Sequence, residues 1–184
     1  MSLTLKDRKF TVEEYFQLEE EGEIRHEFID GNLFEMPGAS TEHHLLIKRF
    51  EKLFDQLFAQ KGYTIFRETM KVKIYDEDKF YYPDLFITRE ENTASNTYAK
   101  LEPEIIVEVT SESTWKKDSI DKLIQYQKFP TLKYYLIAEQ NKPEVIVISK
   151  NNKDNWQSET YNGTDAIIHL TLFNVMLSLS EIYI

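Results

Sequence analysis

The sequence contains no cysteine. This excludes a disulfide framework, a thiol nucleophile and a cysteine-ligated zinc site. The five glycines and five prolines among 184 residues are too few for a loop-dominated or repetitive fold. The chain is 41% hydrophobic and 14% aromatic, so it can bury a substantial core. We therefore expect one folded domain over residues 1–184.

Long apolar runs are also missing. No stretch approaches the roughly 20 apolar residues that a membrane-spanning helix needs. The segment 1–10 is polar and of mixed charge, unlike a secretory signal peptide. We therefore expect no membrane partner and a cytoplasmic location.

Positive charge is scarce overall, since the formal net charge is -10. A protein that coats nucleic acid passively usually has a basic domain, so this class is disfavoured. An enzyme acting on DNA stays compatible, because it can surround acidic metal ligands with a few local cations. Its binding to DNA should then be weak and sensitive to salt.

Local patterns predict an α/β fold with helices on both faces of a mixed sheet. Thr11 and Glu14 form a capping-box pattern at the start of a short helix, and Asp30-Gly31 predicts a β-hairpin turn. Further helices are expected at 41–60 and 118–129. Strands are expected at 64–75, 80–88, 104–110, 134–139 and 144–149, with late strands near 156–161 and 166–170 and an apolar tail that packs on the body.

Two carboxylates stand out by their position in these strands. Glu108 interrupts an almost entirely apolar strand that we expect to be central, where a charge is costly unless it is paired or bound to metal. Asp84 begins the preceding strand, so adjacent strands can bring the two together. Oxygen ligands of this kind suit Mg²⁺ or Mn²⁺. Spacing alone also allows a plain turn aspartate and a solvent-facing glutamate.

Several sequence blocks occur in an order that resembles a known family. They are Thr11-Val12-Glu13-Glu14-Tyr15, Glu27-Phe28-Ile29-Asp30-Gly31, Tyr82-Pro83-Asp84-Leu85, 103–114, and then Asp118, Lys122, Tyr126 and Tyr135-Leu136-Ile137. This pattern is similar to the Uma-two family of restriction endonuclease-like proteins, within the PD-(D/E)xK nuclease superfamily. The resemblance covers nearly the whole chain, and the block that ends in Glu108-Val109-Thr110-Ser111 is its most specific part.

The resemblance implies a restriction-endonuclease-like core, with residues 1–38 as a helix and hairpin packed on it. It implies Asp84 and Glu108 as catalytic metal ligands. The superfamily's usual lysine would stand at Thr110, so the simple motif fails here. The family pattern moves the basic role to Lys122 on the next helix, with Tyr126 as its support. We also expect Ile120, Leu123 and Ile124 to form the core-facing side of that helix.

Three further residues are candidates with two interpretations each. Glu27 matches an acidic family position and either completes the metal site or forms a salt bridge. His43 is either a core histidine or a group that orients a metal ligand or contacts substrate. Ser111, with Ser113 and Thr114, either caps the next segment or binds a phosphate. Lys116 and Lys117 could attract the DNA backbone, although two lysines in a loop are more often only solvated. Lys71 and Lys73 alternate on one face of a predicted strand and could line a groove.

These observations lead to a metal-dependent DNA endonuclease as the main hypothesis. A symmetric homodimer would suit cleavage of both strands of a duplex. The main alternative is a binding or regulatory module that keeps the fold without catalysis. A two-carboxylate glycoside hydrolase is a weaker third hypothesis.

Overall fold

A computed structural model describes residues 8–36, 38–89, 98–100, 102–111, 115–151 and 155–184. Its centre is a six-stranded mixed sheet. In spatial order the strands are β11 (Trp156–Asn162), β10 (Glu144–Lys150), β9 (Tyr134–Glu139), β8 (Ile105–Thr110), β6 (Leu85–Arg89) and β3 (Tyr63–Arg67). β8 runs parallel to β9 and antiparallel to β6. Because β8 is central, its apolar sequence is buried on both faces, as predicted.

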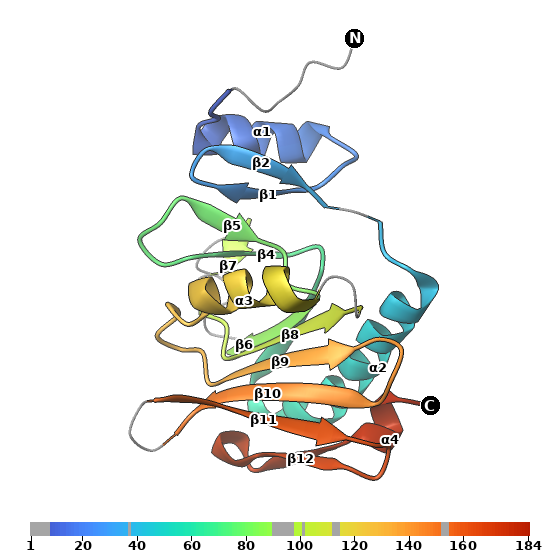
Figure 1. Ribbon diagram of the computed structural model, residues 1–184. Helices are drawn as coiled ribbons and strands as arrows, with labels where there is room; N and C mark the ends of the chain where they lie inside the picture. Colours follow the sequence, from blue (N-terminus) through green and yellow to red (C-terminus); the bar gives the residue numbers. More distant parts are fainter. Residues whose placement is uncertain (1–7, 37, 90–97, 101, 112–114, 152–154) are drawn as a thin grey trace.

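Two helices cover the faces of this sheet, and Figure 1 shows α3 in front of it and α2 behind it. Helix α2 (Thr41–Phe58) packs its buried side, including Leu46, Phe50 and Phe54, into the larger core cluster. A 3-10 turn (Ala59–Lys61) and Gly62 in the left-handed conformation end it. Helix α3 (Trp115–Tyr126) packs against the other face through Tyr126. The prediction of helices on both faces is confirmed.

The N-terminal segment joins a second sheet. Helix α1 (Val12–Glu21) begins with the predicted capping box between Thr11 and Glu14. The hairpin of β1 (His26–Ile29) and β2 (Asn32–Glu35) turns at Asp30 and Gly31, whose φ angles are both positive, as a type I′ turn requires. The five strands are, in order, β2, β1, β5 (Lys79–Tyr81), β4 (Lys71–Lys73) and β7 (Ala99–Lys100).

Several predicted boundaries differ in the structure. The single strand expected at 64–75 is divided into β3 and β4, which belong to different sheets. The strand expected at 80–88, with an early interruption at Pro83, is divided there into β5 and β6, since proline supplies no backbone N–H for a continuous ladder. Helix α3 spans Trp115–Tyr126, whereas the sequence predicts a helix over 118–129.

The C-terminal tail packs on the body as expected. The tail expected at 172–184 follows β12 (Ile167–Leu170), one of the expected late strands, and it contains most of a 3-10 turn (Thr171–Phe173), β13 (Val175–Ser178) and α4 (Leu179–Ile182). Its buried side chains belong to the same core cluster as those of α2. Among the described residues, no helix combines the length and apolar character needed to cross a membrane.

Candidate active site

Asp84 lies directly before β6 and after Pro83, in the short segment that separates β5 from β6. Its Oδ2 accepts a 2.7 Å hydrogen bond from the backbone N–H of Val109, on the neighbouring strand β8. Its Oδ1 lies 3.1 Å from Nε2 of His43. These two contacts fix the Asp84 carboxylate between β8 and the start of α2. Its partner on β8, Val109, is the residue after Glu108.

Glu108 is buried in β8 and points toward α3, on the same face as Ile106. The Tyr126 hydroxyl donates a 2.9 Å hydrogen bond to Glu108 Oε1, and Lys122 Nζ lies 3.4 Å from the same oxygen. Burial raises the pKa of Glu108, and the Asp84 and Glu27 carboxylates add to the rise while Lys122 opposes it. A buried carboxylate is costly to charge unless it is paired or bound to a metal, and Glu108 is paired with Lys122.

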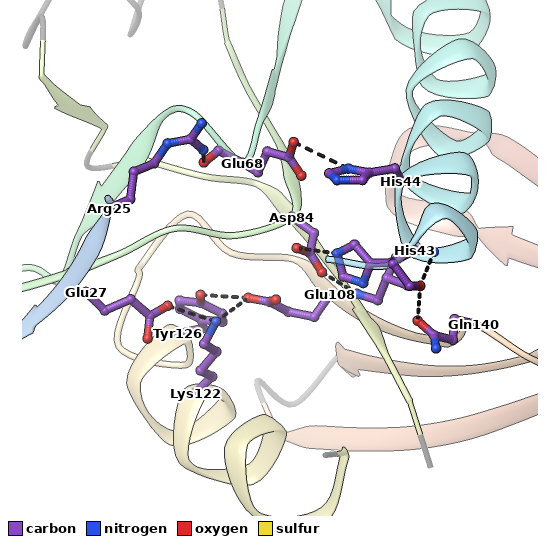
Figure 2. Close-up of polar contacts among 12 residues, drawn as sticks. Arg25, Glu27, His43, His44, Glu68, Asp84, Glu108, Lys122, Tyr126 and Gln140 are labelled. Atoms are coloured by element: carbon purple, nitrogen blue, oxygen red, sulfur yellow. Dashed lines mark hydrogen bonds and ion pairs between the residues drawn. The ribbon is translucent and has the colours of Figure 1, made fainter. Parts of the chain in front are cut away.

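Lys122 reaches from α3 into the space between two carboxylates. Its Nζ lies 2.9 Å from Glu27 Oε1 and 3.4 Å from Glu108 Oε1 (Figure 2). Burial alone lowers the pKa of Lys122, but the two carboxylates outweigh it and raise the pKa above its ordinary value. Lys122 is thus held as a cation over the whole ordinary pH range.

The predicted core-facing side of α3 is wrong for two of its three residues. Ile120 and Ile124 are each 54% exposed, whereas Tyr126 is fully buried and Leu123 is half-buried. The ion pairs of Lys122 and the hydrogen bond of Tyr126 turn their side of the helix inward. The side of α3 that faces the sheet is therefore the one that carries the polar contacts to Glu108 and Glu27.

Glu27 lies on β1, three residues before the hairpin turn. Its side chain is 15% exposed and is paired with Lys122. The pair is partly buried, and whether Glu27 also completes a metal site stays a prediction. Glu27 supplies this site with a carboxylate from the N-terminal hairpin.

His43 lies in the first turn of α2. Ser40 Oγ accepts a 3.2 Å hydrogen bond from the His43 backbone N–H, which fixes the start of the helix. Burial alone lowers the pKa of His43, but the hydrogen bond and charge of Asp84 raise it above its ordinary value. The side chain contacts Asp84, and the role of His43 in orienting a metal ligand or contacting substrate stays a prediction.

Glu68 is a site residue that the sequence did not reveal, because the segment around it was predicted as continuous strand. It lies between β3 and β4. One ligand atom from each of His43, Glu68 and Asp84 falls within 4.8 Å of the other two. Within the described ranges, this is the group of three such side chains that is spaced to hold a metal ion. Glu108 and Glu27 are outside it.

The remaining candidates are less informative. Ser111 is half-buried directly after β8, and its role stays a prediction. Lys71 is buried against the rings of Tyr15, Phe16 and Tyr82, so the prediction that it lines an open groove is wrong. Ser113, Thr114 and the side chains at 116 and 117 lie outside the described residues.

The comparisons agree with this geometry at the level of the fold. The chain resembles the crystal structure of "a putative nuclease belonging to DUF820 from Anabaena variabilis ATCC 29413" with a TM-score of 0.76 and 15% identity. The match covers 95% of this chain and 97% of that one. The two proteins therefore share a fold, and the predicted α/β class with helices flanking a mixed sheet is confirmed.

The family model described as "Uma2: Putative restriction endonuclease" matches residues 12–180, so the chain belongs to the Uma2 family. Two uncharacterized proteins of Synechocystis sp. are each 28% identical to it. The first match covers 86% of this chain and 84% of the relative, and the second covers 95% and 100%. The resemblance seen in the sequence is confirmed.

Proposed function

We propose that the protein is a metal-dependent endonuclease that hydrolyses phosphodiester bonds in DNA. The observation that carries the proposal is the approach of Lys122 Nζ to within 3.4 Å of Glu108 Oε1. The usual superfamily lysine is absent at Thr110, and this contact supplies a cation to the same carboxylate from the next helix. Membership of the Uma2 family supports the same chemistry.

Asp84 and Glu108 are the residues that would hold Mg²⁺ or Mn²⁺. The donor set fits, because both are carboxylates, Glu108 lies on β8 and Asp84 directly precedes the neighbouring strand β6, and the Asp84 carboxylate is bonded to the N–H of Val109, the residue after Glu108. A bound divalent cation polarises the phosphodiester and lowers the pKa of a bound water. Asp84 is oriented by His43 and Val109, while Glu108 is oriented by Tyr126 and Lys122.

Lys122 would stabilise the negative charge that develops on the phosphate in the transition state. Its raised pKa keeps it protonated, so a role as an acid or base at neutral pH is disfavoured. Glu27 holds the Lys122 ammonium 2.9 Å away and acts as a positioning residue. Fixed cations in a site that excludes water are among the strongest contributors to such catalysis.

Binding to DNA would be weak and salt-sensitive, because the net charge of -10 opposes a polyanion outside the site. A symmetric homodimer would place two such sites on opposite strands. Sedimentation with and without a short duplex would test this arrangement. A protein that cleaves both strands as a monomer would refute the dimer but not the nuclease.

The direct test measures cleavage of duplex DNA in Mg²⁺ and in Mn²⁺ by the wild type and by three variants, Asp84→Asn, Glu108→Gln and Lys122→Met. Each variant should lose at least about 100-fold in rate. Lys128→Met is a matched control, because Lys128 follows α3 but pairs with Glu77 at the surface. Undiminished cleavage in the three site variants would sink the assignment.

A second candidate function is a binding or regulatory module without catalysis. It is favoured by one observation, the full engagement of Glu108 Oε1 with Tyr126 and Lys122. Calorimetric titration with Mn²⁺ separates the two functions. Absence of binding at millimolar Mn²⁺ would favour the module, whereas binding that Asp84→Asn removes would favour the nuclease.

A further inference from the structure

A buried polar network connects α1 to two distant segments of the chain. Its centre is Glu19, near the end of α1, whose side chain is only 4% exposed. Glu19 Oε1 accepts a 2.9 Å hydrogen bond from the backbone N–H of His26 and lies 3.1 Å from His26 Nδ1. Glu19 Oε2 accepts a hydrogen bond from the Tyr82 hydroxyl. All three residues lie outside the carboxylate site described above.

The position of Glu19 follows from helical spacing. It lies four residues after the buried Tyr15 and therefore on the same side of α1. A carboxylate at this depth is costly unless its oxygens are hydrogen-bonded, and both oxygens of Glu19 have such partners. The Tyr15 hydroxyl donates a 2.8 Å hydrogen bond to the backbone oxygen of His26. The N–H and the carbonyl of His26 are thus both bound by side chains of one helix.

The contact with His26 acts on the next residue, Glu27. Successive side chains of a strand point to opposite faces. In β1, His26 and Phe28 face α1, whereas Glu27 faces the other way and contacts Lys122. A displacement of His26 would therefore move Glu27 relative to the Lys122 ammonium.

The contact with Tyr82 acts on Asp84 through one intervening residue, Pro83. The proline ring fixes the φ angle at about −65° and also restricts the residue before it. The segment Tyr82-Pro83-Asp84 therefore has little rotational freedom, so a fixed Tyr82 hydroxyl limits where Asp84 can lie. The Val109 N–H, which donates a 2.7 Å hydrogen bond to Asp84 Oδ2, reports that position.

We propose that Glu19 is a positioning residue for the reaction. Through Tyr82 it sets the place of Asp84, and through His26 it sets the place of Glu27. The proposal rests on the function proposed above for these two carboxylates. Helix α1 is then a working part of the enzyme, although Glu19 itself contacts neither the substrate nor the metal ion.

The first test is ¹H–¹⁵N NMR spectroscopy of the metal-free protein, read at the Val109 amide. Glu19→Gln and Tyr82→Phe should move the Val109 amide proton upfield, because displacement of the Asp84 carboxylate weakens this hydrogen bond. Asp84→Asn gives the reference shift for a weakened acceptor. Tyr82→Phe loses only a hydroxyl group, so it keeps the test decisive if Glu19→Gln does not fold.

Phe16→Leu is the matched control. Phe16 is a partly buried residue of the same helix that packs against the third core cluster, and its ring is not part of the polar network. The variant should lower the free energy of unfolding in urea while it leaves the Val109 resonance and the cleavage rate unchanged. If Glu19 served folding alone, all three variants would behave in this way.

Cleavage of duplex DNA provides the second test. kcat should fall at least about tenfold in Glu19→Gln and in Tyr82→Phe, since a misplacement of about 1 Å can cost about 100-fold in rate. KM for DNA should stay unchanged, because both side chains are buried.

The outcomes separate the two proposals. A Val109 resonance that is unchanged in Glu19→Gln and Tyr82→Phe, or shifted equally in Phe16→Leu, would overturn the positioning role even if DNA is cleaved. A shift without a fall in kcat would overturn it as well. A shift specific to the two network variants, in a protein that cleaves no DNA, would support the placement of Asp84 by Glu19 and refute the nuclease.

Discussion

Two lysines, Lys71, which is buried, and Lys122, which is partly buried, have opposite electrostatic surroundings in this fold. Lys71, on β4, lies 3.9 Å from one carboxylate, Glu19, and is surrounded by the aromatic rings of α1 and Tyr82. Lys122, on α3, lies 2.9 Å from Glu27 and 3.4 Å from Glu108. Burial lowers the pKa of Lys71 because one distant carboxylate does not compensate for it, whereas two close carboxylates raise the pKa of Lys122.

The difference separates a structural lysine from one suited to chemistry. The ammonium of Lys71 is stabilised mainly by ring faces and packing. The ammonium of Lys122 compensates the negative charge of Glu108 and Glu27, and its contact with a phosphate belongs to the proposed function. Substitutions at and around the two lysines should therefore have unequal effects.

The largest effect is expected for Lys122→Met. Removing the cation leaves Glu108 and Glu27 buried together, which should lower the free energy of unfolding by about 3–5 kcal/mol. The measurement is urea unfolding at pH 8 in chelator, with Lys128→Met as the surface control. Wild-type stability in Lys122→Met would show that the two carboxylates do not depend on this lysine.

Tyr126→Phe should have the next largest effect. It removes the hydroxyl that donates a 2.9 Å hydrogen bond to the buried Glu108 carboxylate, a bond worth about 1.5–3 kcal/mol. Tyr161→Phe is a suitable control, because its hydroxyl bonds Glu159 at the surface. The same urea titrations apply, and equal losses for the two tyrosines would contradict a special role for Tyr126.

Lys71→Met should change the free energy of unfolding by no more than about 1 kcal/mol, since an apolar side chain of similar size often replaces a buried charge without loss. Glu19 would keep its hydrogen bonds from the Tyr82 hydroxyl and from the His26 backbone N–H. The measurement is the difference from wild type at pH 7. A loss as large as that of Lys122→Met would refute the contrast between the two lysines.

The smallest effect is a pH dependence. In the folded state the pKa of Lys71 lies below its ordinary value of 10.5. As the pH rises, the folded protein therefore releases this proton before the unfolded chain does. Wild type should therefore gain stability relative to Lys71→Met as the pH rises toward 10.5. The pKa of Lys122 is raised, so its contribution to the free energy of unfolding should not change with pH below pH 10.5. Unfolding between pH 8 and 10.5 tests both, and a flat difference for Lys71 would contradict its lowered pKa.

Short-range signals were read correctly from the sequence because their chemistry is local. The capping box of Thr11 and Glu14 and the turn at Asp30-Gly31 involve only residues a few positions apart. The apolar run of β8 likewise predicted a central strand. The family pattern indicated Lys122, and its place beside Glu108 stands in the structure, while its catalytic role stays a prediction.

Long-range effects were harder to predict. The turn at Glu68 contains neither glycine nor proline, and it is held by Arg25, which is 43 positions away. The inward side of α3 depends on Glu27 and Glu108 in two other elements. A pattern read along one segment does not contain these partners. For the same reason the cluster of His43, Glu68 and Asp84 could not be found from spacing.

The central position of β8 also affects the order in which parts of the protein unfold. Its amide protons are bonded to strands on both sides over much of its length, so they should exchange with solvent only when the whole molecule unfolds. The edge strand β11 has one neighbour and mostly exposed side chains, so it should open locally first. Local opening of β11 would leave Glu108 in place. Release of Glu108 from its position in β8 would instead require global unfolding.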